Sequence, residues 1–292
     1  MGAVAIPLRD ARPATMVFKR VVSAVILIPA AIWIVAIAPP WVFRATVIAL
    51  SAVAAWELGR LFRQAGRLVW PWMGALCAAA VTASFATMDP TWAGELAVAV
   101  PGGAVLAALT MTTALILATS LWTARSPGSD TATIGLSGLC YVGVLMGHAL
   151  LIQQLPDGRG LVLFLLGVTW AGETAAYAVG SLLGRQKLAP RISPGKTIEG
   201  AVAQVIGSAL AAWILGGLTS GWSAIEALGA GVILGIVGQV GDLTESAIKR
   251  SVGAKDAGGA IPGHGGLLDR IDGLLFNIPA LFYYAGVLGG RA

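Results

Sequence analysis

Apolar runs about as long as a transmembrane helix, roughly 20 residues, recur along the whole chain and constrain its fold more than any other feature. Only 11% of its 292 residues are charged, whereas a soluble domain carries about 25%. Such a chain cannot cover a water-facing surface, so lipid is its expected main solvent. We expect an all-α polytopic membrane protein with about nine spans, at 21–38, 41–58, 69–88, 102–122, 131–153, 161–183, 198–218, 224–248 and 271–289.

The distribution of positive charge predicts how these spans are oriented. With the N-terminus in the cytoplasm and the spans alternating, all but three of the 19 lysines and arginines fall in or beside inner segments. Positive charge favours the cytoplasmic side, so we expect the N-terminus inside and the C-terminus outside. Because these residues occupy short loops, the charge does not indicate nucleic-acid binding. The regions expected are a cytoplasmic basic leader at 1–20, N-terminal helices at 21–153, and a C-terminal region at 161–292 with cytoplasmic loops at 184–197 and 249–270.

Two further features of the sequence concern processing and cysteine. The first apolar run has the flanks of a signal peptide, but it is longer than a signal core and Pro39 and Pro40 follow it, which favours a retained helix. Cys77 and Cys140 lie inside apolar segments. Buried cysteine behaves as a small apolar residue, so neither a disulfide framework nor a zinc site is indicated.

The stretch from Asp242 to Asp272 gathers five of the chain's 14 acidic residues and one of its two histidines. Helical spacing puts Asp242, Glu245 and Lys249 on one face. Asp269 and Asp272 follow at the start of the last span. Carboxylates on two helices that flank one loop can converge on Mg²⁺, which binds through oxygen ligands and substrate phosphates. The plainer alternative is a charged loop with helix caps.

Other polar positions lie in or beside the apolar spans. Ionisable groups within a membrane are functional candidates, and Glu173 is expected to line a wet site, with structural pairing as the alternative. For Glu57, an interfacial salt bridge with Arg60 is the favoured interpretation. The turn from Ser193 to Thr197 contains Lys196 and opens onto a helix, an arrangement suited to phosphate.

These motifs resemble the phosphatidate cytidylyltransferase (CDP-diacylglycerol synthase) family. The resemblance rests on Ser246-Ala-Ile-Lys249-Arg250, Lys255-Asp256 and Pro262-Gly-His264-Gly265-Gly266-Leu-Leu-Asp269-Arg270-Ile-Asp272, with weaker matches at 170–177 and 193–200. Motif-level similarity is confined to roughly residues 165–275. The sequence departs from the family pattern at Glu173, where aspartate is usual, and at Gly195, where a second lysine is usual.

The resemblance implies that CTP and phosphatidate are converted to CDP-diacylglycerol and pyrophosphate, with Mg²⁺ as cofactor and a second ion left open. It implies a plasma-membrane enzyme whose site faces the cytoplasm, where CTP is found; a homodimer is also left open. By analogy with the family, Asp242 and Asp269 are metal ligands. Asp272 is added as a third ligand, because carboxylates on the two helices that flank the loop are expected to converge. The catalytic candidates are Asp242, Lys249, Arg250, Lys255, Asp256, His264, Asp269 and Arg270. The substrate-binding candidates are Glu173, Tyr177, Ser193, Lys196, Thr197, Ser246, Gly265 and Gly266.

Three rival interpretations are weaker. Asp269-Arg-Ile-Asp272-Gly273 mimics the start of the CDP-alcohol phosphotransferase pattern, but no Ala-Arg follows and two further aspartates are missing. An ion-coupled transporter predicts charge spread along the helices, whereas here the charge gathers at one face. A cytidylyltransferase of the same fold that acts on another lipid-linked substrate stays open.

Overall fold

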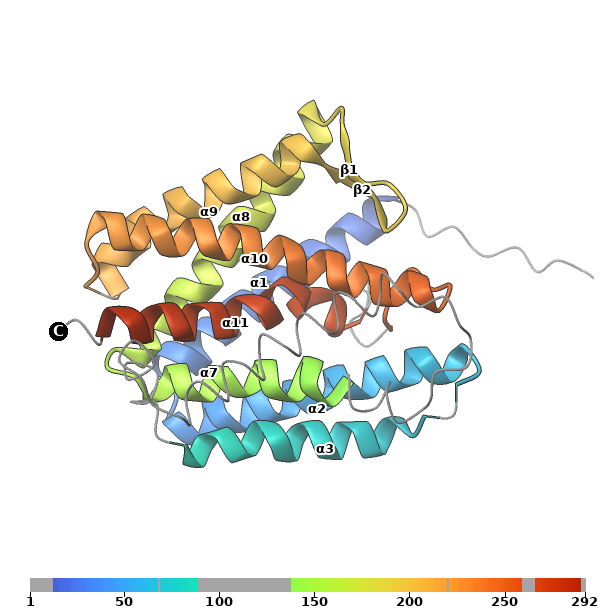
Figure 1. Cartoon of the computed structure of the whole chain (residues 1–292), viewed down its shortest axis with the longest axis horizontal. Helices are drawn as coiled ribbons and strands as arrows, with labels where there is room; N and C mark the ends of the chain where they lie inside the picture. Colours follow the sequence, from blue (N-terminus) through green and yellow to red (C-terminus); the bar gives the residue numbers. More distant parts are fainter. Residues whose placement is uncertain (1–12, 68, 89–137, 220, 259–265, 290–292) are drawn as a thin grey trace, which may run out of the picture.

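The computed structural model describes residues 13–67, 69–88, 138–219, 221–258 and 266–289 (Figure 1). The expected span at 102–122, most of the basic leader, His264 and Gly265 lie outside the described residues. The helices are α1 (Pro13–Ala36), α2 (Pro40–Gln64), α3 (Pro71–Ser84), η1 (Phe85–Thr87), η2 (Leu139–Val144), α7 (Leu145–Gln154), α8 (Gly158–Leu183), α9 (Ile198–Thr219), α10 (Ala224–Ser251) and α11 (Leu268–Gly289).

Five of the described helices are long and apolar enough to cross a membrane, namely α2, α8, α9, α10 and α11. Each coincides with an expected span, because an uninterrupted apolar run is a local signal of helix and membrane together. The expectation of an all-α membrane protein is confirmed at this level. The total of nine spans and the orientation of the termini stay predictions.

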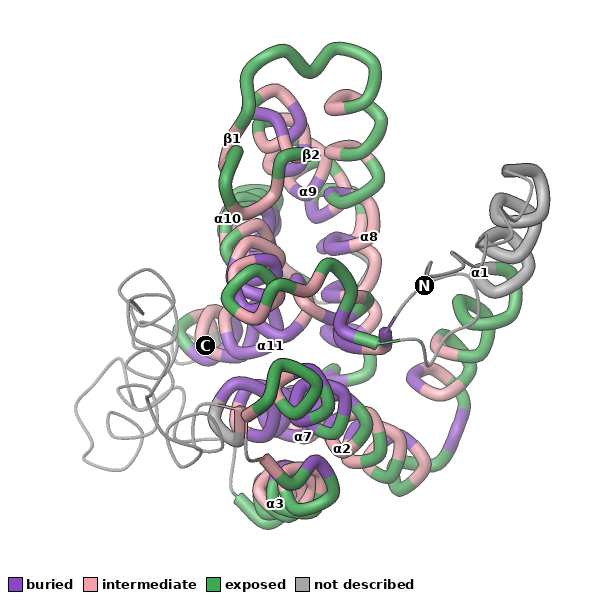
Figure 2. The backbone as a smooth tube through the Cα atoms, turned by 90° about the vertical axis from the view of Figure 1, so that its right-hand side faces the viewer, coloured by how far each residue is buried: buried purple, intermediate pink, exposed green. Residues whose placement is uncertain are grey.

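The helices form two groups with α11 between them. Helices α8, α9 and α10 make one group, and α2, α3 and α7 make the other (Figures 1 and 2). Helix α11 packs against α10 and α8 on one side and against α7 and α2 on the other. Fully buried aromatic residues, among them Tyr141, Phe164 and Phe282, fill the interior.

Small residues let α9 approach α10 closely. A Cβ added at Gly231 would lie 2.7 Å from the Cα of Ala209, and one at Gly235 would lie 2.8 Å from the Cα of Val205. Close backbone approach through small residues is the usual means of packing helices in lipid, where burial of apolar surface gives little driving force. The opposite face of α9 is exposed and apolar, with Val202, Ile206, Leu210 and Trp213 on it, and it suits contact with lipid.

A short hairpin follows α8 at the end of the first helix group. Strand β1 (Lys187–Ala189) pairs antiparallel with β2 (Ser193–Thr197), with Ala189 opposite Ser193 and Lys187 opposite Thr197. The sequence predicted a turn here and not two strands. The pairing satisfies backbone groups that a helix-to-helix connection leaves open. Helix α9 begins at Ile198, directly after β2, as the turn-to-helix pattern predicted.

Candidate active site

The hairpin fixes Lys196 and Thr197 at the start of α9. The hydroxyl of Thr197 accepts a hydrogen bond from the backbone N–H of Gly200 at 3.1 Å, which satisfies one open donor of the first helical turn. Glu199 accepts one from the backbone N–H of Gln186 at 3.2 Å and so ties the beginning of the hairpin to the same turn. Lys196 is therefore held beside a helix N-terminus, where anions are favoured.

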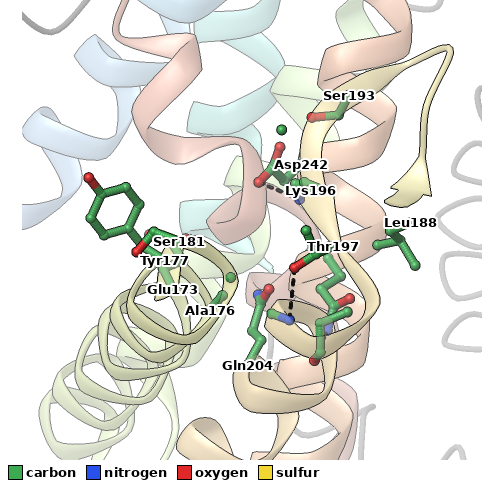
Figure 3. Close-up of a pocket in the computed structure, with 15 residues that line it drawn as sticks. Glu173, Ala176, Tyr177, Ser181, Leu188, Ser193, Lys196, Thr197, Gln204 and Asp242 are labelled. Atoms are coloured by element: carbon green, nitrogen blue, oxygen red, sulfur yellow. Dashed lines mark hydrogen bonds and ion pairs between the residues drawn. The ribbon is translucent and has the colours of Figure 1, made fainter. Parts of the chain in front are cut away.

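Lys196 joins the hairpin to α10. Its Nζ lies 2.5 Å from Oδ2 of Asp242, and the two side chains are 21% and 37% exposed (Figure 3). An ion pair with this much exposure contributes little to stability by itself. Both charged groups remain accessible from the pocket beside them.

A pocket of about 470 Å³ lies between α8, α9, α10 and β2 (Figure 3). Tyr177 stands at its rim, 78% exposed, with its ring directed away from Asp242. The structure thus brings two segments separated by more than 40 residues, the hairpin and the C-terminal half of α10, to one cavity. Six predicted site residues line it: Glu173, Tyr177, Ser193, Lys196, Thr197 and Asp242.

Two glutamines in the pocket wall were missed by sequence reasoning. The amide of Gln204 is directed into the pocket, although the residue is only 7% exposed (Figure 3). Gln239 also lines the pocket, and its Nε2 donates to the carbonyl of Ala201 at 2.8 Å. The available signal was a polar side chain inside an apolar span, but Gln204 and Gln239 were not singled out.

Three carboxylates come close together beside this pocket. Glu173 and Asp242 line it, and Asp272 lies near enough to repel both electrostatically, with Lys196 offsetting part of the charge. A Cβ added at Gly273 would lie 3.0 Å from Oε1 of Glu173, so Glu173 reaches from α8 to the backbone of α11. Glu173 lines the pocket, and its expected place in a wet site stays a prediction.

A second charged cluster lies where α10 meets the start of α11. Lys249 forms ion pairs with Glu245, one turn earlier, and with Asp269, whose Oδ1 is 2.7 Å from Nζ. Asp269 also accepts hydrogen bonds from the backbone N–H groups of Gly266 at 2.8 Å and Ala257 at 3.1 Å. Glu245, expected on the same helix face as Asp242 and Lys249 but not among the candidate site residues, is fully buried. Asp269 therefore fastens the chain on both sides of the loop that precedes α11.

The other signature residues lie around this cluster. Arg250 donates to the carbonyls of Ile192 at 3.1 Å and Ala254 at 3.0 Å, so it links the hairpin to the segment after α10. Ser246 is buried, whereas Lys255 and Asp256 are exposed. Arg270 is exposed and acts electrostatically on Glu173 from α11.

Glu57 does not make the expected salt bridge. Arg60 instead places its guanidinium over the ring of Trp56, 4.7 Å from the ring centre. Glu57 is 2% exposed, and its Oε2 accepts a hydrogen bond from the backbone N–H of Leu268 at 2.8 Å. The sequence signal, a carboxylate inside an apolar span, was present, but the nearby arginine suggested the wrong partner.

The described residues can be tested for their fit to a metal ion. Within them, no three histidine, cysteine or acidic side chains are arranged to hold a metal by themselves. Mg²⁺ usually binds through one or two carboxylates plus substrate phosphates. Asp242 and Asp272 offer carboxylate oxygens near enough to repel each other, so their donor chemistry fits such an ion, while Lys196 is the cation that Asp242 holds in this structure. The carboxylate of Asp269 is taken up by Lys249 and by backbone N–H groups.

Comparison with known proteins identifies similar chains. A sequence model described as the cytidylyltransferase family matches residues 18–288. The chain is 42% identical over 177 residues to the uncharacterized protein YnbB of Escherichia coli, covering 58% of this chain and 59% of that one. It is 42% identical over 156 residues to the phosphatidate cytidylyltransferase of Brucella suis, covering 52% and 56%. For the phosphatidate cytidylyltransferase of a Synechocystis species, identity is 42% over 138 residues, covering 47% and 46%. The chain thus spans about half the length of these curated relatives.

Proposed function

Because the chain belongs to the cytidylyltransferase family, we propose that it transfers the cytidylyl group of CTP to phosphatidate, giving CDP-diacylglycerol and pyrophosphate. Two of the relatives described above carry the name phosphatidate cytidylyltransferase. The observation that carries the proposal is the pocket in which Lys196 and Asp242 meet at the ends of apolar helices. A phosphate fits its charged rim, while acyl chains fit the apolar helix faces.

The reaction needs charge neutralisation and alignment more than covalent chemistry from the protein. A phosphate oxygen of phosphatidate attacks the α-phosphorus of CTP, the bond to the β-phosphate oxygen breaks, and pyrophosphate leaves. Bound Mg²⁺ supplies neutralisation of the triphosphate charge. Asp242 and Asp272 are the pair whose surroundings suit the ion. Asp269 is proposed as a further ligand on the family resemblance, and a second ion stays open.

The cations are assigned to phosphate in this proposal. Lys196, with Ser193 and Thr197, forms one wall of the pocket at the start of α9. The opposite wall would come from the last turn of α10, the segment after it and the start of α11, which supply Lys249, Arg250, Lys255 and Arg270. Asp256 and His264 stay candidates for hydrogen bonding or proton transfer near the leaving group.

The setting of the enzyme is part of the same proposal. We place it in the plasma membrane as a multi-pass protein whose pocket opens to the cytoplasm, since CTP is cytoplasmic and the hairpin is rich in basic residues. Whether the enzyme forms a homodimer stays open.

Purified protein supplied with labelled CTP, phosphatidate and Mg²⁺ tests this function. We expect equal amounts of CDP-diacylglycerol and pyrophosphate. Asp269→Asn should lower kcat by about a hundredfold or more, the usual loss when a group that stabilises charge in the transition state is removed. Asp157→Asn is the matched control. Asp157 lies at the N-terminal end of α8, away from the pocket, and its φ of 54° is a conformation that asparagine also adopts.

The outcomes separate the parts of the proposal. Absence of product from wild-type protein with phosphatidate would overturn the function, and product with a different lipid phosphate would move the assignment to that substrate. Full activity of Asp269→Asn would remove Asp269 from the site while leaving the reaction in place.

A further inference from the structure

Glu57 is a buried carboxylate that the proposed chemistry does not use. It lies on α2, in the helix group opposite the pocket, and is 2% exposed. Its Oε2 accepts a hydrogen bond from the backbone N–H of Leu268, 211 positions later in the chain, at 2.8 Å. Its Oε1 has no hydrogen-bond partner among the described residues. Placing a carboxylate in the interior costs several kcal/mol unless something compensates, so its position calls for an explanation.

The compensation comes from the N-terminus of α11. Leu268 is the first residue of that helix, and the first N–H groups of any helix lack partners within it. They need an acceptor from outside the helix. Glu57 supplies that acceptor from a different helix group, so it acts as a helix cap that reaches across the molecule.

Glycines on both sides of the preceding loop make room for this carboxylate. A Cβ added at Gly258 would lie 2.9 Å from Oε1 of Glu57, and one at Gly266 would lie 2.8 Å from Oε2. Both distances are closer than real Cβ contacts allow. Oε2, the atom near Gly266, is anchored by its hydrogen bond to Leu268, and Oε1, near Gly258, belongs to the same carboxylate. Glu57 therefore lies against the chain where it leaves for the loop and where it returns.

The same two chain ends hold Asp269. Ala257 lies before the loop and Gly266 lies after it, and the backbone N–H groups of both donate to the Asp269 carboxylate. Asp269 in turn pairs with Lys249 of α10. A chain of direct contacts thus runs from α2 through the start of α11 to the charged cluster of α10.

We propose that Glu57 is a positioning residue for cytidylyl transfer: by capping α11 from α2, it fixes the ends of the loop that orient Asp269 and Lys249. This rests on the proposed function. Glu57 itself touches neither substrate. Its removal should loosen the geometry at Asp269 without removing a binding contact, so kcat falls while the KM for CTP stays near its wild-type value.

The test compares Glu57→Ala, Glu57→Gln and Glu57→Asp in the full-length protein. Glutamine keeps an acceptor oxygen at the same reach and loses the charge, whereas aspartate keeps the charge and is one methylene too short. We expect the alanine and aspartate variants to lower kcat by about tenfold to a hundredfold, the size of loss that a misplacement of about 1 Å produces. The glutamine variant should retain most of the wild-type kcat. Arg60→Ala is the matched control, one turn further along α2 and stacked on Trp56.

Hydrogen exchange gives a readout that does not depend on activity. In the alanine and aspartate variants, amides of 254–258 and 266–270 should exchange faster, while those of the 187–197 hairpin should not. Faster exchange throughout α2, α3 and α7 would instead show a general structural role and overturn the proposal. An aspartate variant more active than the glutamine variant would also overturn it, because charge and not reach would then matter. If the wild-type protein made no CDP-diacylglycerol, the exchange pattern would still decide whether Glu57 orders this loop.

Discussion

Lys249 is held between two carboxylates where the C-terminal end of α10 meets the N-terminal end of α11. Its side chain is 13% exposed, Glu245 beside it is fully buried, and Asp269 closes the cluster. Removing one partner from a buried charge pair leaves the other charge without compensation, which costs far more than the pair contributes. At this residue, stability and the proposed phosphate binding are therefore coupled and must be separated by the choice of variant.

Lys249→Met should destabilise the protein by about 3–5 kcal/mol, because the carboxylate of Glu245 is left buried and unpaired. The double variant Lys249→Met with Glu245→Gln should recover most of that loss, because Glu245 is then uncharged and Asp269 keeps its hydrogen bonds from the backbone N–H groups of Ala257 and Gly266. Unfolding followed by tryptophan fluorescence in detergent measures both. Lys255→Met, at an exposed lysine, is the control and should unfold like wild type. A single variant as stable as wild type would show that the cluster carries no buried charge of consequence.

At the scale of whole helices, α9 packs against both α8 and α10. The pocket lies between these three helices, so it depends on the spacing between them. The spacing is set by glycines and other small residues along α10 and α8. Gly231 has no room for a methyl group, whereas Gly217 at the far end of α9 has nothing within 4 Å of an added Cβ. Replacing each of these two glycines by alanine therefore distinguishes the effect of steric crowding on stability from the intrinsic effect of replacing glycine in a helix.

Gly231→Ala should lower the free energy of unfolding by about 1–3 kcal/mol, the usual cost of overpacking a tight contact. Gly217→Ala should be neutral or stabilising by up to about 1 kcal/mol, since alanine is the better helix former and meets no neighbour there. Thermal unfolding of both variants in the same detergent measures the difference. Equal stability of the two would mean that α9 and α10 are not held by close backbone approach.

The same scale shows what the sequence could predict. Apolar runs are local, so the span expected at 161–183 ends at the same residue as α8, and the one at 224–248 starts with α10. The turn at Ser193 was predicted, but its pairing with Lys187–Ala189 was not, because strands of three and five residues are too short to show an alternating pattern. Glu57 was assigned to Arg60, three residues away, because a contact over 211 positions leaves no mark in one sequence. Local patterns in the sequence thus predict the helices and the charged residues of the pocket wall. The connection between the two helix groups depends on long-range contacts, which a single sequence does not reveal.

At the scale of the whole molecule, both ends of α8 are informative about orientation. The hairpin follows its C-terminal end, and the short connection containing Pro156 precedes its N-terminal end. Helix α8 has 26 residues and is therefore about 39 Å long, enough to cross a bilayer. The two connections should then face opposite sides of the membrane, and the basic hairpin should face the cytoplasm.

Single cysteines on these connections test that orientation. Cys77 and Cys140 are first replaced by alanine, and then Gly195→Cys or Pro156→Cys is introduced; both positions are exposed, and Gly195 has nothing within 4 Å of an added Cβ. A membrane-impermeant maleimide should label Pro156→Cys in intact cells and Gly195→Cys only after the membrane is opened, because the pocket must face the compartment that holds CTP. The reverse pattern would put the pocket outside and contradict the proposed function in cells. Labelling of both from one side would show that α8 does not cross the bilayer, and the alternation on which the nine-span prediction depends would fail.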